Sequence, residues 1–99
     1  MLIVSGTYRA KTGKREEFMK TMYEQGIVDA IRKEKGNISY DYYYPVEGGE
    51  GDIFFLEKWS DREAWENHKI ADHVVKLQDL KKQYGVETIP GFVFEVEQK

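Results

Sequence analysis

The stretch Asp52–His73 places the strongest constraint on how this chain of 99 residues can fold. Within Asp52–Trp59, apolar side chains occupy both alternating sets of positions, so a strand here has two substantially apolar faces. The sequence then changes to Ser-Asp-Arg-Glu, in which Ser60 and Glu63 match a capping box that starts a helix near Asp61. A strand of this kind needs cover on both sides, either from its own chain or from a second copy.

The first third of the chain predicts a strand followed by one long helix. Leu2–Tyr8 is short, apolar and without helical spacing, which is typical of a strand. In Arg15–Glu34 the apolar side chains recur in pairs every four residues, which predicts an amphipathic helix of about five turns. We expect Thr12 to cap its start, Gly26 to lie in its buried stripe where another backbone approaches closely, and Gly36 to end it.

The rest of the chain predicts a hairpin, a second helical region and a last strand. Ile38–Tyr44 is rich in aromatic residues and forms a strand, with its even-numbered residues on one face, that pairs with the strand described first. The next helix weakens near Ile70, and we expect Asp72 to cap a further helix that Gly85 ends. Val86–Glu97 is the last strand, and a Pro-Gly pair within it predicts a kink or a bulge.

The order of these elements predicts an α+β fold. A βαββ(α)αβ order gives a ferredoxin-like sandwich, in which the helices lie on one antiparallel four-stranded sheet. A chain of 99 residues holds one core, so we expect a single domain over residues 1–99. The helices can cover only one face of the sheet, although three strands are apolar on both faces. We therefore predict a homodimer in which two sheets pack face to face.

Composition excludes several kinds of partner and site. The 15 basic and 18 acidic residues are interspersed and leave a net charge of −3, so we expect neither nucleic acid nor a membrane as a partner. The absence of cysteine excludes disulfides, thiolate metal ligands and a cysteine nucleophile. We read no signal peptide and no segment long enough to span a bilayer, and therefore expect a cytoplasmic protein.

One pattern in the chain points beyond the fold. Its members, in order, are Glu57-x-Trp59, an acidic helix cap, Glu63-Ala64 followed by Trp65, and then His68 and His73. Together with the first strand and the glycine before the second strand, this pattern resembles the antibiotic biosynthesis monooxygenase superfamily, and in particular its short bacterial quinol-monooxygenase-like members. The resemblance extends over nearly the whole chain and implies a ferredoxin-like domain of the dimeric α/β-barrel type.

The resemblance also implies an activity. Family members of known activity oxidise phenolic or quinol-like aromatic compounds with dioxygen and use neither a metal nor a flavin, so no cofactor is expected. Such a reaction requires a base, stabilisation of the resulting oxyanion and exclusion of water. Histidine is a suitable base at neutral pH, and His68 is the candidate catalytic residue. The candidate substrate-binding residues are Trp59, Trp65, Tyr40, Tyr42, His73 and Asn67.

Each of these residues also has a purely structural interpretation. His68 lies near the end of its helix, where a capping or structural hydrogen bond is an alternative to catalysis. His73 suits a helix start, both tryptophans suit the core, and Asn67 suits solvent. The tyrosines of the second strand line either a pocket or the dimer interface.

Two other classes of function remain open from the sequence. One is a non-oxidative enzyme, such as an isomerase acting on a breakdown product of a small signalling metabolite. The other is a small-molecule-binding protein without chemistry. The haem-degrading subgroup of the same superfamily is not expected, because the places of its asparagine, tryptophan and histidine hold Gly6, His68 and Gln78. A metal site is not expected either, because His68 and His73 do not stack on one helix face and no third histidine completes a site.

Overall fold

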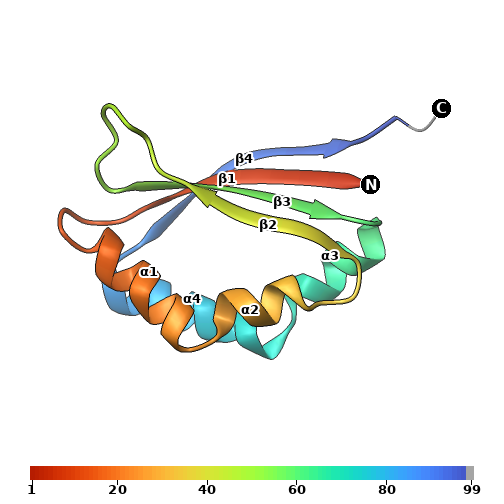
Figure 1. Ribbon diagram of the computed structural model, residues 1–99, viewed down its shortest axis with the longest axis horizontal. Coiled ribbons are helices and arrows are strands. Elements are labelled where there is room, and N and C mark those ends of the chain that lie inside the picture. The colour runs from red at the N-terminus through yellow and green to blue at the C-terminus, as the bar shows by residue number, and fades with distance from the viewer. Residues whose placement is uncertain (98–99) are drawn as a thin grey trace.

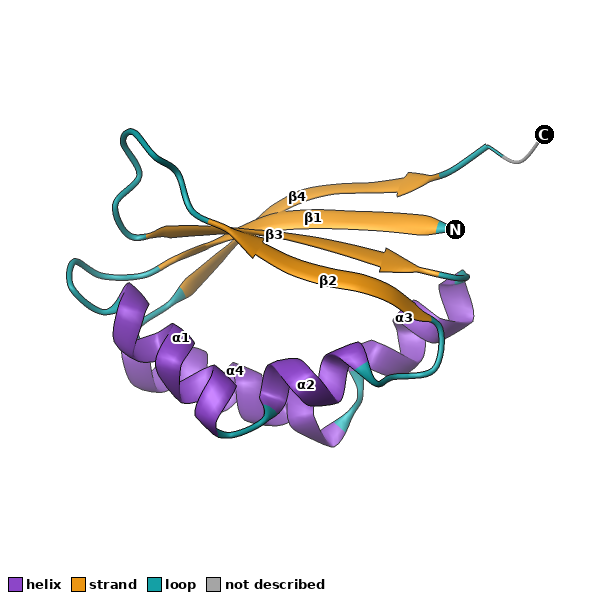
Figure 2. Ribbon diagram, viewed as in Figure 1, coloured by secondary structure: helices purple, strands orange, loops and turns teal. Residues whose placement is uncertain are grey.

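The chain folds into a four-stranded sheet with its helices on one side. The computed structural model describes residues 1–97, and Figures 1 and 2 show the helices along a single face of the sheet. The elements are β1 (Leu2–Arg9), α1 (Arg15–Glu24), α2 (Ile27–Arg32), β2 (Asn37–Tyr43), β3 (Asp52–Trp59), α3 (Arg62–Lys69), α4 (Asp72–Tyr84) and β4 (Glu87–Glu95). The strands run antiparallel to their neighbours in the order β2-β3-β1-β4. The predicted α+β, ferredoxin-like fold is confirmed.

The core lies between the helices and the face of the sheet that they cover. On β3 the alternating side chains of Ile53, Phe55, Glu57 and Trp59 point into this layer, and none is more than 7% exposed. Phe18 of α1 is fully buried against them. Truncating a large buried side chain of this kind to alanine costs about 3–5 kcal/mol. This layer therefore contributes most of the burial that stabilises the fold.

The opposite face of the sheet carries aromatic side chains that no element of residues 1–97 covers. Phe54 on β3 is 40% exposed, and Phe92 and Phe94 on β4 are 68% and 53% exposed. The rings of Phe92 and Phe94 stack with their centres 5.6 Å apart, and the Tyr43 ring lies 6.1 Å from that of Phe54. The prediction of a second apolar face is confirmed. We call these four residues the outer face.

The prediction of one helix over Arg15–Glu34 is wrong, because the segment forms two helices. α1 ends at Glu24, Gly26 adopts a left-handed φ of 72°, and α2 begins at Ile27. Glycine takes this conformation without steric cost, and a left-handed residue ends the helix before it. A Cβ at Gly26 would meet no heavy atom within 4 Å, so the expected close backbone approach is absent. The apolar stripe continues across the break because both helices pack on the same sheet.

Three helix caps also differ from prediction. At α4 the N-cap is Ala71 rather than Asp72, and it makes no side-chain capping bond. Lys14, rather than Thr12, occupies the N-cap position of α1 and makes no side-chain capping bond. At α3 the cap is Asp61, whose Oδ1 accepts a hydrogen bond from the Ala64 N–H at 2.8 Å. The backbone N–H of Ser60 is instead held by a 2.8 Å hydrogen bond to the turn before β2. This bond keeps Ser60 at the strand end and moves the cap to the next residue.

Two bulges decide which side chains face outward. In β2 the register against β3 shifts between Asn37 and Ser39, where the Asn37 side chain donates to the Ser39 carbonyl at 3.1 Å. Ile38 is therefore 54% exposed and does not share the inner face with Tyr40, as strict alternation had predicted. The bulge predicted at Pro90–Gly91 is confirmed, because the pairing of β4 with β1 shifts register there.

The turn before β2 provides a test of how closely the hairpin packs on α3. Gly36 has a φ of 84°, and a Cβ there would lie 2.5 Å from the Ala64 Cβ; Gly48 has a φ of 67° with no heavy atom within 4 Å. We expect Gly48→Ala to lower the free energy of unfolding by the roughly 1–2 kcal/mol of a left-handed alanine. Gly36→Ala should lower it clearly more, as measured by urea denaturation. Equal losses would contradict the close packing of α3 on this turn.

Candidate functional site

A cleft of about 320 Å³ opens between the helix-covered face of the sheet and helices α3 and α4. Its buried members come from β1, β3 and both helices, and its exposed members form a rim. The lining residues are Val4, Tyr8, Phe55, Glu57, Trp65, His68, Lys69, Val74, Leu77, Gln78, Lys81 and Thr88. This combination of an apolar wall with a few convergent polar groups is typical of a small-molecule site.

A larger hollow of about 560 Å³ lies elsewhere, where the N-terminal residue meets the end of β4. It is lined by residues 1–2, 60–62 and 95–97, with no histidine, tyrosine or tryptophan among them. It therefore offers neither a base for neutral pH nor an aromatic wall. The chemistry of the lining, rather than the volume, makes the cleft beside His68 the candidate site.

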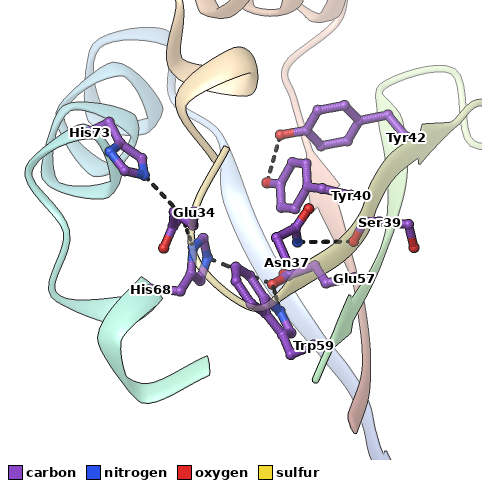
Figure 3. Close-up of polar contacts among 9 residues, drawn as sticks. All are labelled: Glu34, Asn37, Ser39, Tyr40, Tyr42, Glu57, Trp59, His68 and His73. Atoms are coloured by element: carbon purple, nitrogen blue, oxygen red, sulfur yellow. Dashed lines mark hydrogen bonds and ion pairs between the residues drawn. The ribbon is translucent and has the colours of Figure 1, made fainter. Parts of the chain in front are cut away.

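The imidazole of His68 is the central group of the cleft. It is 7% exposed, and α3 holds it over the indole of Trp59, with the two ring centres 4.7 Å apart. Its Nδ1 lies 2.7 Å from Oε2 of Glu34, and its Nε2 lies 3.6 Å from Oε1 of Glu57 (Figure 3). His68 is thus positioned on both sides by carboxyl groups from outside its own helix.

Glu34 binds both histidines of the protein through one oxygen atom. Its Oε2 lies 2.7 Å from Nδ1 of His68 and 2.9 Å from Nε2 of His73, as Figure 3 shows. A carboxylate accepts hydrogen bonds, so each of these ring nitrogens donates to it. In neutral His68 the proton therefore resides on Nδ1, and the free lone pair is on Nε2, on the side of Glu57.

Glu57 is a buried carboxyl group on the inner face of β3. It is 5% exposed and accepts a 3.0 Å hydrogen bond from the Trp59 indole N–H. Burial raises the pKa of Glu57, and the negative charge of Glu34 adds to this effect, while His68 and the Trp59 bond act against it. A carboxyl group whose pKa is raised beside an imidazole is a candidate acid or base.

Three tyrosines near Glu57 and His68 remain neutral. The hydroxyl oxygens of Tyr40 and Tyr42 are 2.7 Å apart. The centre of the Tyr8 ring lies 4.8 Å from that of Phe55 and 6.3 Å from that of Tyr42. Burial is the main cause that raises the pKa of Tyr8, Tyr40 and Tyr42. They therefore act as neutral donors or aromatic surfaces rather than as bases.

The structure places the candidate residues at different distances from the cleft. His68 and Trp65 line it, and Trp59 packs directly behind His68. His73 reaches the site through Glu34. Tyr40 is 1% exposed in the core, and Tyr42 packs against that core. Asn67 borders a separate groove of about 250 Å³ that also contains Glu34 and Gly36.

Sequence reasoning did not assign Glu34, Glu57, Tyr8 or Lys81 to the site. Glu57 had a usable signal, because it is an acidic residue on the buried face of an alternating strand. Glu34 had none, because it lies 34 residues from His68 and beyond the end of α2. The histidines converge on it because they belong to two helices, separated by the break at Ile70–Ala71, and not to one helix face.

Neither a metal-binding group of side chains nor a membrane-spanning helix is found among residues 1–97. No group of three or more histidine, aspartate or glutamate side chains there has the arrangement needed to hold a metal ion. In the same residues, every helix is too short or too polar to cross a bilayer.

Comparison with known proteins gives a family and a fold. The family model described as antibiotic biosynthesis monooxygenase matches residues 1–80, whereas no curated protein matches the chain. One similar structure is a Deinococcus radiodurans protein that is provisionally described as an antibiotic biosynthesis monooxygenase. It has a TM-score of 0.85 at 21% sequence identity, and the match covers 100% of this chain and 95% of the Deinococcus chain. A conserved Methanosarcina mazei protein has a TM-score of 0.78 at 23% identity, with 97% and 92% covered. At identities this low, the two structures demonstrate a shared fold and nothing about a shared function.

The raised pKa of Glu57 predicts a specific dependence of stability on pH. Above the ordinary glutamate pKa of 4.5, the unfolded chain loses this proton before the native protein does, so stability falls as pH rises until native Glu57 also ionises. We expect the stability of Glu57→Gln relative to the wild type to increase with pH over that window and then stay constant. Urea unfolding between about pH 4 and pH 8 measures this difference.

The matched control for this experiment is Glu63→Gln, which removes an exposed carboxyl group from α3. The control reports the effect of losing one negative charge without burial. A difference between Glu57→Gln and the wild type that is independent of pH, or that the control reproduces, would contradict the assignment of a raised pKa to Glu57.

Proposed function

This chain belongs to the antibiotic biosynthesis monooxygenase family, and from that premise we propose that it oxidises a small, quinol-like aromatic compound with dioxygen, without a metal or a flavin. The observation that carries this proposal is the placement of His68. Its ring lies at the wall of an aromatic-lined cleft, its Nδ1 lies 2.7 Å from Glu34, and its Nε2 lies 3.6 Å from Glu57, which also lines the cleft. An oriented base in a partly desolvated cleft is what deprotonation of a phenol requires.

The reaction needs no external source of electrons. Removal of a phenolic proton makes the aromatic ring an electron donor, and dioxygen is the acceptor. One oxygen atom enters the product at a ring carbon, which becomes a carbonyl group, and the other leaves as water with the two hydrogens that the substrate loses. The protein therefore has to move protons, stabilise an oxyanion and exclude water.

The residues around His68 suit these tasks. His68 accepts the phenolic proton on Nε2 and becomes a cation between the carboxyl groups of Glu34 and Glu57. An imidazolium with two acidic neighbours is stabilised by both of them. Phe55 and Trp65 supply aromatic surface on the cleft wall, against which a flat ring can pack.

One alternative uses the same groups without dioxygen. The pair of His68 and Glu57 also suits a proton shift between two carbons of a small metabolite, as in an isomerase. A third class, a binding protein without chemistry, uses only the cleft. Oxygen consumption separates the monooxygenase reaction from both alternatives.

We also propose that the protein is a homodimer that pairs the outer faces of two copies. Tyr43, Phe54, Phe92 and Phe94 leave a broad apolar surface in water, which soluble proteins rarely keep exposed. The same patch on both copies fits a two-fold interface, which is the commonest kind in soluble oligomers. Because the helices occupy the other face of the sheet, such pairing leaves the cleft of each copy open.

The oxidation proposal predicts oxygen uptake with at least one member of a panel of quinols and phenols. We expect His68→Ala to reduce kcat by at least about 100-fold, because general base catalysis contributes at least that factor. A suitable control is Gln83→Ala, an exposed residue of α4 outside the cleft. An oxygen electrode makes the measurement. Undiminished uptake by His68→Ala would remove this residue from the mechanism, and no uptake with any compound would favour the alternatives.

The dimer proposal predicts that the wild type sediments with twice the 11.6 kDa mass of the chain at micromolar concentration. Phe94→Glu places a charge in the apolar interface and should give a monomer, because burying an unpaired charge is costly. Val46→Glu changes a fully exposed valine in the loop after β2 and should leave the dimer intact. Equilibrium ultracentrifugation distinguishes these states, and a monomeric wild type would refute the proposal.

A further inference from the structure

Lys81 is a half-buried cation in the wall of the cleft. Its ammonium nitrogen lies 5.0 Å from the centre of the Tyr8 ring. Its hydrogen bonds go to neutral groups, the Gln78 side-chain oxygen at 3.3 Å and the Thr88 hydroxyl. None of the ion pairs formed among residues 1–97 includes Lys81. By contrast, Lys69 on the rim of the same cleft pairs with Glu66 at 3.4 Å.

The absence of a counter-ion within residues 1–97 has an energetic consequence. Burial lowers the pKa of Lys81, because the ammonium group loses water without gaining a carboxylate. An anionic group in the cleft would supply the missing opposite charge, and the attraction would be stronger there than in bulk water. The cleft therefore favours a ligand with a negative charge near Lys81 over a neutral ligand of the same shape.

The cleft separates its acid–base groups from this cation. α4 presents Val74, Leu77 and Lys81 to the cleft along one side of the helix. The helix begins beside the two histidines, since His73 shares Glu34 with His68. Lys81 follows eight residues later, about 12 Å along the helix axis. A lysine side chain and one aromatic ring with substituents at opposite ends can together span that distance.

We propose that the ligand of the cleft is a hydroxylated aromatic acid, whose anionic group binds Lys81 while its hydroxyl group faces His68. The role of the hydroxyl group rests on the proposed oxidation, whereas the recognition of the anion does not. Both a carboxylate and a phosphate have the required charge for a lysine. Glu57, the carboxyl group of the lining, lies beside His68 and forms no ion pair with Lys81.

Calorimetric titration under nitrogen tests this assignment without any oxidation step. The probes are 4-hydroxybenzoate, 4-hydroxyphenyl phosphate and 4-hydroxybenzamide, which is a neutral compound of nearly the same shape as the first. We expect at least one of the two anions to bind the wild type about tenfold more tightly than the amide, as one charge-assisted contact predicts. The tighter of the two identifies the anionic group.

Three variants identify the source of the preference. Lys81→Met should remove it, and Lys81→Arg should retain it because the charge remains. Lys76→Met, which removes an exposed lysine of α4 outside the cleft, should also retain it. If Lys81 had a purely structural role, Lys81→Met would change the stability of the protein but not the ratio of its affinities for the anion and the amide. A preference that persists in Lys81→Met would overturn the proposal.

If a variant does not fold, the affinities of the wild type for the three compounds still test the proposal. Equal affinity for the anions and the amide, or no binding of any of the three compounds, would overturn the proposal. Its failure is distinct from failure of the proposed oxidation. Binding of the anions without oxygen uptake would leave anion recognition standing and refute the oxidation. The opposite result would be that neutral quinols are oxidised as fast as hydroxylated aromatic acids and that Lys81→Met takes up oxygen as fast as the wild type. That result would leave the oxidation standing and refute anion recognition by Lys81.

Discussion

The hydrogen bonds of a single carboxylate organise the candidate site of this molecule. Glu34 follows α2, and its Oε2 binds His68 of α3 at 2.7 Å and His73 of α4 at 2.9 Å. Three helices are thereby tied together at the edge of the cleft. Because Glu34 determines which nitrogen of His68 is free, the same bonds set both the packing of α3 and the chemistry available to the cleft. Loss of this carboxylate would affect structure and proposed function together.

The cleft is built from groups that a purely structural core would avoid. Glu57 is buried on a strand whose neighbouring inward positions are Phe55 and Trp59, and its burial disfavours the charged form. Its hydrogen bond from Trp59 and the nearby His68 reduce that cost without removing it. Such a buried group in a cleft is a candidate for a role in binding or catalysis.

The sheet has to satisfy two different requirements on its two faces. The inner face buries aromatic and aliphatic side chains under the helices and also forms the floor of the cleft. The outer face, with Phe92 and Phe94 more than half exposed, has no such cover within residues 1–97. Side chains alternate along a strand, so a change in register would exchange the two sets. The bulges in β2 and β4 therefore matter for both the cleft and the proposed dimer interface.

The sequence by itself determined the order of the strands and of the helical regions between them, the strand Asp52–Trp59 with its two apolar faces, and the α+β fold, because these depend on local periodicity. It did not reveal that the first helical region divides at Gly26. It also placed His68 and Trp65 correctly on one helix. Only the tertiary structure decided that Glu34 joins the two histidines and that Lys81 lies in the same cleft. These contacts link residues far apart in the chain, and their geometry depends on how the helices pack on the sheet and on one another, which no local pattern encodes.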